Sequence, residues 1–267
     1  MLQYKDRTFR VGAAITLFML CVILIGTFWT PFDPNTMNAA EKMAAPSARH
    51  LLGTDNFGRD ILSRVVEGAR ATFLIALCSV AVGLLAGLVI GGLTGYYGGW
   101  VDELLMRLND SITAFPSILL ALVLIAIFGS GKYNIILALG VLFVPSFARI
   151  VRMEVARQKE LDYVRNARLM GVGDMRILFV HILPNIVPVL LSTVAIGFNN
   201  AVLAEASMSY LGVGVQPPDP SLGRMLNEAQ GYLLSAPWYA ISAGAAIILL
   251  VLGFGLVSEG LGGGENA

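Results

Sequence analysis

The Gly-Ser-Gly-Lys segment at residues 129–132 is the part of the sequence that most nearly matches a nucleotide-binding loop. Such a loop needs a leading glycine, backbone N–H groups that cradle phosphates, and a serine or threonine directly after the lysine. Here Ala126 stands in place of the leading glycine, and Tyr133 follows the lysine. We therefore interpret the segment as a turn with an interfacial lysine, and we expect no ATPase site in this chain.

Hydrolytic and metal chemistry also lack their usual residue sets. The sequence contains neither the HExxH pattern of zinc proteases nor the GxSxG pattern of serine hydrolases. The two histidines, His50 and His181, are expected on opposite sides of a membrane, and His181 is interpreted as a surface or interface residue. Cys21 and Cys78 both lie in apolar stretches, which favours buried thiols over a disulfide or metal site. No catalytic residue, metal site or cofactor is expected.

The composition indicates a membrane protein. Of the 267 residues, 56% are hydrophobic and 13% are charged, and the mean hydropathy is +0.73. Soluble domains have roughly 45–50% apolar and roughly 25% charged residues. The net charge of zero gives no argument for a nucleic-acid partner.

Six apolar stretches are long enough to cross a bilayer as helices, which takes about 20 residues each. Backbone groups in hydrocarbon must be hydrogen-bonded internally, and no stretch alternates like a barrel strand, so we expect an all-α polytopic membrane protein. The expected spans are Val11–Thr30, Ala71–Tyr97, Val101–Phe128, Asn134–Met153, Ile186–Leu203 and Trp238–Val257. The second span carries glycines at spacings that suit close helix contact, namely Gly83, Gly87, Gly91, Gly92 and Gly95.

The basic residues orient these spans. Three precede the first span, and seven, from Arg149 to Arg176, surround the connection between the fourth and fifth spans, which places both sets in the cytoplasm. The first outer loop also carries five basic residues, which argues against this orientation. The two cytoplasmic sets together contain more basic residues, so we keep the orientation. The expected organisation is a cytoplasmic N-terminus (1–10), a first span (11–30), an extracytoplasmic loop with an amphipathic segment (31–70), a five-span core (71–260) with a cytoplasmic loop (154–184) and an extracytoplasmic loop (206–237), and a cytoplasmic tail (261–267).

The cytoplasmic loop contains a basic segment, residues 161–185, that helical spacing divides into two short helices. Leu161, Val164, Ala167 or Arg168, and Met170 or Gly171 form one stripe. The Gly-Val-Gly turn at 171–173 breaks the helix, and Asp174 is expected to cap a second helix over Met175–Ile182. Two interpretations remain open at this point. The pair lies on anionic lipid, or it docks into a partner and transmits a rigid-body motion.

The segment resembles the cytoplasmic loop of ABC importer permeases, whose pattern is Glu-Ala-Ala, three residues, Gly, nine residues, then Ile-x-Leu-Pro. Ala167, Gly171 and Leu183-Pro184 match, whereas Arg165-Asn166 and His181 replace the first two positions and the isoleucine. The stretches His50–Arg70 and Ala204–Leu226 are similar to the second permease subunit of dipeptide, oligopeptide and nickel importers. The likeness covers nearly the whole chain and departs from the family in the glycine-rich last residues.

The resemblance implies a type I importer permease core in the inner membrane of a prokaryote. It implies a heterodimer with a second permease subunit, two cytoplasmic ABC ATPase subunits that hold ATP and Mg²⁺, and an extracytoplasmic solute-binding protein. Di- or oligopeptides are the expected cargo, and nickel or a metal chelate is the alternative. A self-sufficient secondary transporter or channel would show internal repeats, and none is convincing here.

Three sets of residues are the candidates for these roles. The ATPase-coupling set is Asp162, Tyr163, Arg165, Ala167, Arg168, Gly171, Val172, Asp174 and Met175. The translocation-pathway set is Asn199, Asn200, Glu205, Arg107 and Asp110, because polar groups within a membrane are costly. The binding-protein docking set is Asp55, Arg59, Asp60, Gln216, Asp219 and Arg224.

Purely structural roles would also explain the residues of the pathway and docking sets. Arg107 and Asp110 are expected to pair with each other near the cytoplasmic end, and Glu205 to sit at the outer interface. A hydrogen bond between helices is as good an explanation for Asn199 and Asn200 as a cavity. The outer segments, including an amphipathic helix expected over Ser221–Leu234, would otherwise form a lid over the pathway mouth.

Overall fold

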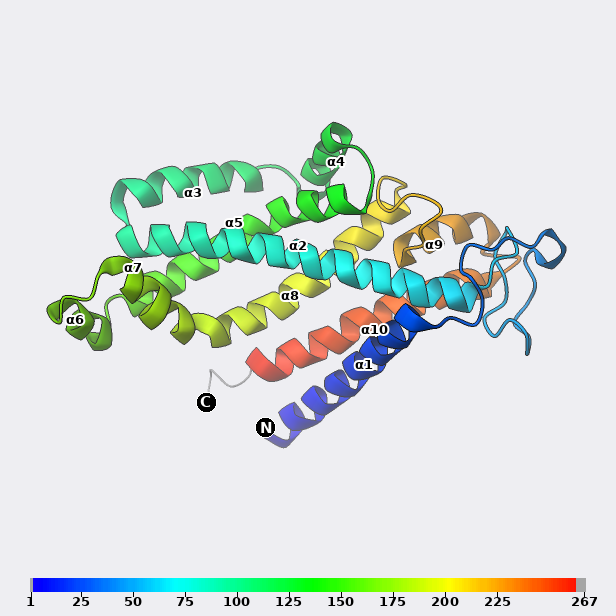
Figure 1. Ribbon diagram of the computed structural model, residues 1–267, viewed down its shortest axis with the longest axis horizontal. Helices are drawn as coiled ribbons and strands as arrows, with labels where there is room; N and C mark the ends of the chain where they lie inside the picture. Colours follow the sequence, from blue (N-terminus) through cyan, green and yellow to red (C-terminus); the bar gives the residue numbers. More distant parts are fainter. Residues whose placement is uncertain (1, 263–267) are drawn as a thin grey trace.

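The computed structural model describes residues 2–262 as a bundle of long helices (Figure 1). The five long helices are α1 (Leu2–Phe28), α2 (Ile61–Tyr97), α5 (Lys132–Gln158), α8 (Leu183–Tyr210) and α10 (Pro237–Gly262). All five are long and apolar enough to cross a membrane, and a sixth crossing is made if the bent pair α3–α4 counts as one span. The expected all-α polytopic fold is confirmed. Residues 263–267 of the expected tail lie outside the described residues.

The third expected span is not one straight helix. It divides into α3 (Gly99–Thr113) and α4 (Ser117–Phe128), whose axes differ by 90°. The break falls at residues 114–116, because Pro116 disfavours helical backbone at the residue before it. α3 carries all the charged residues of this pair and lies alongside α2 and α5 (Figure 1), whereas α4 is apolar after Ser117.

α2 begins ten residues earlier than expected, so the outer loop covers residues 31–60 rather than 31–70. Asp60 caps the helix by accepting a 2.8 Å hydrogen bond from the backbone N–H of Ser63. The 37 residues of α2 span roughly 55 Å at 1.5 Å per residue, which exceeds the hydrocarbon thickness of about 30 Å. α2 is therefore longer than one untilted crossing requires.

The glycines of α2 allow α5 to approach closely, as expected. A Cβ atom on Gly87 would lie 2.5 Å from the Cβ of Phe147, and one on Gly95 would lie 2.6 Å from the carbonyl oxygen of Arg152. Gly83 and Gly91 face α5 in the same way. Small residues every fourth position thus bring the two helix backbones together, which is how helices gain packing energy in lipid.

The basic cytoplasmic segment differs from the expected pair of short helices. α6 (Asp162–Leu169) forms, but the expected second helix is the beginning of α8. α7 (Asp174–Arg176) continues through the π-helical turn η2 (Ile177–Ile182) into α8. Pro184 has no N–H to donate and its ring crowds the preceding turn, which accounts for the wider helical turn before it. Gly173, not Asp174, is the N-cap.

The two ends of the bundle differ in structure (Figure 1). α6, the start of α1 and the end of α10 lie toward one end. The loop 31–60, with the short helix η1 (Ala39–Glu41), lies at the other end together with α9 (Leu222–Ala229) and η3 (Gln230–Tyr232). The expected amphipathic helix is confirmed as α9, which Ser221 caps.

The cysteines are not buried as expected. Cys21 and Cys78 are both exposed on the surface of the chain. The apolar stretches that contain them turn many large apolar side chains outward, among them Phe18, Leu24 and Leu77. In a membrane protein such a face contacts lipid or another subunit, so an apolar neighbourhood in the sequence does not indicate burial within the chain.

Candidate functional site

α6 is held at its end of the bundle by its apolar face. Val164 and Ala167 are fully buried and pack in one cluster with Val155, Ile177 and Ile182. Arg165 and Arg168 of the same helix are exposed. α6 is therefore seated on the ends of α5 and α8, with its two arginines at the surface of the chain.

Polar contacts fix α6 and the turn after it to two further helices. The hydroxyl of Tyr96, at the end of α2, donates a 2.6 Å hydrogen bond to the carboxylate of Asp174. The guanidinium of Arg168 lies 5.3 Å from the centre of the same ring. The hydroxyl of Tyr163 donates to Gln158 of α5 at 2.9 Å, and burial raises the pKa of Tyr163, which keeps this donor protonated.

The turn after α6 requires glycine for its backbone conformation. Gly171 has φ +78°, and nothing lies within 4 Å of a Cβ placed on it. The backbone N–H of Gly171 donates to Arg168, and that of Val172 donates to Ala167, which closes the helix end. The glycine is needed because the left-handed region is costly for other residues, and space is not the constraint.

Large apolar side chains are exposed at the tip of this segment. Leu169 is 85% exposed, Met170 is 77% exposed and Met175 is 52% exposed. Met170 and Gly171, the last positions of the expected stripe, are both exposed, because the chain leaves the helix there. Of the nine coupling candidates, six are exposed and Tyr163 and Val172 are half-buried, whereas Ala167 contacts only the chain's own core. Leu169 and Met170 were not among the coupling candidates, although two adjacent apolar residues beside a helix-ending glycine are a detectable signal.

The structure does not bring the five translocation-pathway candidates together at one site. Asn199 faces α10, and its amide, with oxygen and nitrogen assigned from its neighbours, donates to the Val251 carbonyl at 3.2 Å and accepts from the Gly255 N–H at 3.1 Å. Glu205 is fully buried and accepts hydrogen bonds from Thr72 at 2.7 Å and from Ser209 at 2.6 Å. The first contact joins two helices inside the chain, so the protein itself encloses the Glu205 carboxylate.

Two other pathway candidates form different ion pairs from the one expected. Arg107 pairs with Glu103 at 3.1 Å, and Asp110 pairs with Arg149 at 2.8 Å. The predicted Arg107–Asp110 pair is therefore wrong, because α3 turns the two side chains to different neighbours. Asn200 is exposed and lines a pocket of about 420 Å³ between α4, α5 and α8, to which Ser146 and Ser207 also contribute.

Half of the docking candidates are internal. Asp55, Arg59 and Asp60 are each no more than 3% exposed. Arg59 contacts Asp55 at 2.6 Å and Glu228 of α9 at 2.8 Å, so the pair joins the outer loop to α9. Asp60 contacts His50 at 2.8 Å. These three residues stabilise the outer cap, which is the loop 31–60 together with α9. They present no surface to a partner. Of the others, Asp219 is exposed, and Gln216 and Arg224 are half-buried.

The centre of this ionic cluster is Glu228, which sequence reasoning missed. Its carboxylate also accepts from Tyr239 at 2.9 Å, from Arg224 at 3.2 Å and from Arg64 at 3.4 Å. Burial acts to raise the pKa of Glu228, but the guanidinium groups of Arg64 and Arg59 hold that pKa below its usual range. The carboxylate is therefore charged at neutral pH. Its partners lie up to 169 positions away in the sequence, so no local pattern predicts them.

The predicted turn is confirmed at residues 129–131, between α4 and α5, and Lys132 begins α5. In the part of the chain that the structure describes, no group of three or more His, Cys, Asp and Glu side chains could hold a metal ion. The structure thus has exposed apolar side chains at one end of a helical bundle and a pocket with a mainly apolar lining on its flank. With helices long and apolar enough to cross a bilayer, these features are those of a polytopic membrane protein.

Comparison with known proteins identifies the family of membrane proteins to which the chain belongs. Residues 59–262 match the family described as binding-protein-dependent transport system inner membrane component, and the chain belongs to this family. It is 41% identical to the glutathione transport system permease protein GsiD of Pectobacterium atrosepticum, over 94% of this chain and 85% of that protein. It is 37% identical to the dipeptide transport system permease protein DppC of Alkalihalophilus pseudofirmus, over 96% of this chain and 84% of that protein.

Two further matches extend this picture. The di/tripeptide transport system permease protein DppC of Pseudomonas aeruginosa is 39% identical, over 92% of this chain and 84% of that protein. A chain from an inward-facing structure of the MetNI methionine ABC transporter superposes with a TM-score of 0.58 at 21% identity, covering 71% of this chain and 91% of that one. The latter match shows the shared permease fold. The resemblance drawn from the cytoplasmic loop is confirmed.

Proposed function

We propose that this chain forms half of the translocation pathway of an ATP-driven importer of small peptides, and that α6 is the surface on which an ATPase subunit acts. The relatives named above carry glutathione, dipeptides and di- or tripeptides in their names, which favours peptides over nickel as cargo. A second permease subunit would supply the other half. An extracytoplasmic binding protein would deliver the peptide.

The observation that carries the proposal is the exposed apolar tip of α6 on a rigid base. Leu169 and Met170 expose large apolar side chains, and Arg165 and Arg168 lie on the same helix. Apolar side chains beside arginines are typical of the centre of a protein interface. A partner groove with an apolar floor and acidic rim would complement them.

The base of α6 connects the tip to three membrane helices. α2 is joined through Tyr96, α5 through Gln158, and α8 through the buried cluster around Ile177. A push on α6 therefore moves the ends of these helices together, which is what coupling between ATP hydrolysis and transport requires. The ATP and Mg²⁺ would be held by the ATPase subunits.

The bundle would stand in the inner membrane with α6 in the cytoplasm. The excess of basic residues around residues 149–176 supports this orientation. Both termini would then be cytoplasmic, and α9 with the outer loop would face the binding protein. Among the pathway candidates on α8, Asn200 remains accessible in its pocket, whereas Asn199 and Glu205 face neighbouring helices.

The proposal is tested by co-purification with the cognate ATPase subunits. The double substitution Leu169→Ser with Met170→Ser removes the apolar tip and touches no buried contact, so we expect membrane insertion to be retained and the ATPase to be lost. Leu233→Ser with Leu234→Ser is the matched control, because these adjacent leucines are exposed at the opposite end. Undiminished ATPase recovery with the tip variant would exclude α6 as the coupling surface.

A further inference from the structure

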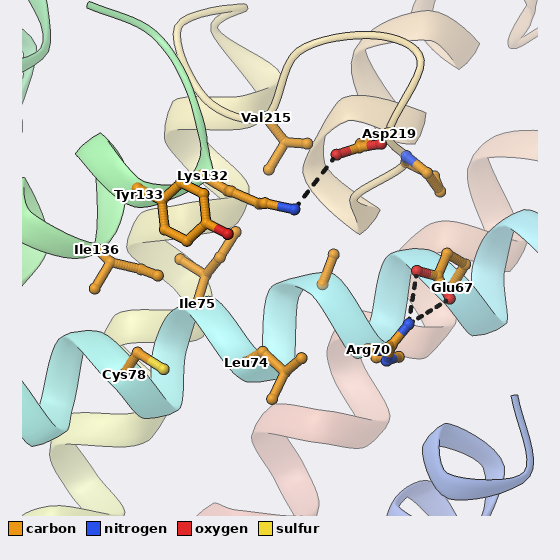
Figure 2. A pocket seen from close by; sticks show the side chains of 12 residues that line it. Glu67, Arg70, Leu74, Ile75, Cys78, Lys132, Tyr133, Ile136, Val215 and Asp219 are labelled. Atoms are coloured by element: carbon orange, nitrogen blue, oxygen red, sulfur yellow. Dashed lines mark hydrogen bonds and ion pairs between the residues drawn. The ribbon is translucent and has the colours of Figure 1, made fainter. Parts of the chain in front are cut away.

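A pocket of about 360 Å³ lies where α2, the start of α5 and the loop before α9 meet (Figure 2). Its volume is within the range of small-ligand sites, about 300–1,000 Å³. Glu67 and Arg70 come from α2, Lys132 begins α5, and Asp219 lies on the loop. The pocket therefore presents two positive and two negative side chains, contributed by three segments that are far apart in the sequence.

The four charges form two ion pairs that a ligand can open. Arg70 lies 3.1 Å from Glu67, and the ammonium of Lys132 lies 3.9 Å from the carboxylate of Asp219. The Lys132 and Asp219 side chains are 51% and 56% exposed, so solvent screens this pair and it contributes little. Figure 2 shows the Lys132 ammonium pointing into the space between the loop and α2. A ligand that carries both charges can replace each pair without leaving an unpaired group.

The charged residues lie at one boundary of the membrane, and the pocket continues below them. No charged residue follows Arg70 on α2 to its end, and none follows Lys132 on α5 before Arg149. Arg70 and Lys132 thus mark the level at which two spans enter hydrocarbon. One to two helical turns deeper, the lining is apolar and includes Leu74, Cys78 and Ile136. Leu74 is 44% exposed, so this part opens sideways along α2.

We infer that this pocket binds a zwitterionic phospholipid whose headgroup carries a primary ammonium. The phosphate would lie between Arg70 and Lys132, the ammonium would donate to Glu67 and Asp219, and an acyl chain would lie on the apolar lining. The pocket charges sum to zero, which matches a zwitterion and leaves an anionic lipid with no cation surplus to neutralise it. This inference does not depend on the proposed transport function.

The side chains that line the pocket also favour one kind of zwitterionic headgroup over another. A primary ammonium has N–H groups that two carboxylates can accept, whereas a quaternary ammonium is bound by several aromatic faces. Tyr133 is the aromatic residue of this lining, and the Lys132 ammonium already lies 5.4 Å from the centre of its ring. A free dipeptide carries the same two charges, but it has no tail to cover an apolar wall that opens at hydrocarbon depth.

The test is lipid retention by the full-length chain. The chain would be placed in nanodiscs with equal amounts of ethanolamine, choline and glycerol phospholipids, then released into detergent for native mass spectrometry. We expect ethanolamine lipid to be retained about tenfold over choline lipid, the ratio that one charge-assisted hydrogen bond supplies. Arg70→Gln with Lys132→Gln should reduce all retention to background. Glu67→Gln with Asp219→Asn should abolish the preference for ethanolamine over choline.

The matched control is Lys42→Gln with Arg49→Gln. It removes one exposed lysine and one exposed arginine from the same end of the bundle, outside the pocket, so lipid retention should not change. Equal retention of the three lipids by the unaltered chain would overturn the inference without any variant. So would unchanged retention in the Arg70–Lys132 variant. Displacement of the lipid by millimolar alanylalanine would assign the pocket to a soluble zwitterion instead.

Discussion

The hydroxyl of Tyr96 lies 2.6 Å from the carboxylate of Asp174, and this contact joins the last turn of α2 to the first turn of α7. The two residues are 78 positions apart. α2 reaches from the outer cap to this point, and Asp174 directly follows the turn that closes α6. The pair is therefore a short route between the surface proposed for the ATPase and the longest helix of the bundle.

Tyr96→Phe should weaken coupling while it leaves the fold intact. The variant keeps the ring beside Arg168 and removes the hydroxyl with its hydrogen bond to the Asp174 carboxylate, a contact worth about 1.5–3 kcal/mol. Dipeptide-stimulated ATP hydrolysis by the reconstituted assembly should fall several-fold, with basal hydrolysis retained. Tyr97→Phe alters the neighbouring tyrosine and serves as the control. Equal stimulation in all three proteins would count against this route.

Gly171→Ala should reduce ATPase binding through the backbone. An alanine at φ +78° costs roughly 1–2 kcal/mol in the left-handed region. We expect weaker co-purification of the ATPase, and partial recovery with Gly171→Asn, because asparagine tolerates this region better. Gly173→Ala is the comparison, since its backbone is extended with φ −67°. If Gly171→Ala and Gly173→Ala behave alike, the conformation of the turn is not what the ATPase requires.

Gly87→Ala should destabilise the packing of α2 against α5. The new methyl group would lie 2.5 Å from the Cβ of Phe147, so the helices must separate, and overpacking of this kind costs roughly 1–3 kcal/mol. Gly244→Ala is the control, because a Cβ there meets only the end of Leu226, at 4.0 Å. Thermal unfolding in detergent should show a lower midpoint for Gly87→Ala alone. A lowered midpoint for both variants would point to glycine flexibility instead.

Glu228→Gln should remove an acid-sensitive part of the stability. The pKa of Glu228 is lower in the folded chain than in the unfolded one, so the folded state favours the charged form. This stabilisation is complete above the unfolded pKa of about 4.3 and is lost as the pH falls through the folded value. Unfolding midpoints of the two proteins should differ at pH 7 and converge as the pH is lowered below about 4. A constant difference across this range would exclude a charged Glu228 as the cause.

The sequence was most informative where one residue type recurs along one helix. Apolar length predicted the spans, and the four-residue spacing from Gly83 to Gly95 predicted the contact with α5. The turn at Gly171 followed from its local pattern. The break at Pro116 was also accessible, because proline restricts the residue before it, but the apolar run after it concealed the change of direction.

What could not be predicted depends on distant partners. Asp55 and Arg59 read as exposed charges until Glu228 is placed beside them by the folded chain. Glu205 likewise resembles a pathway residue until Thr72 and Ser209 enclose its carboxylate. The side chain of Met170 has the same chemistry whether it faces the core or a partner. Only the point at which the backbone leaves the α6 helix decides which way it turns.

The unbroken length of α2 has a mechanical consequence. A rigid rod of roughly 55 Å acts as a lever, so each degree of tilt about the Tyr96 end displaces the Asp60 end by about 1 Å. A tilt of a few degrees, small enough to preserve every contact around α6, would carry the outer cap several ångströms sideways. It would move the α2 wall of the pocket around Arg70 in the same direction. Displacements of that size are comparable to the width of a peptide backbone, and they need no hinge within the membrane.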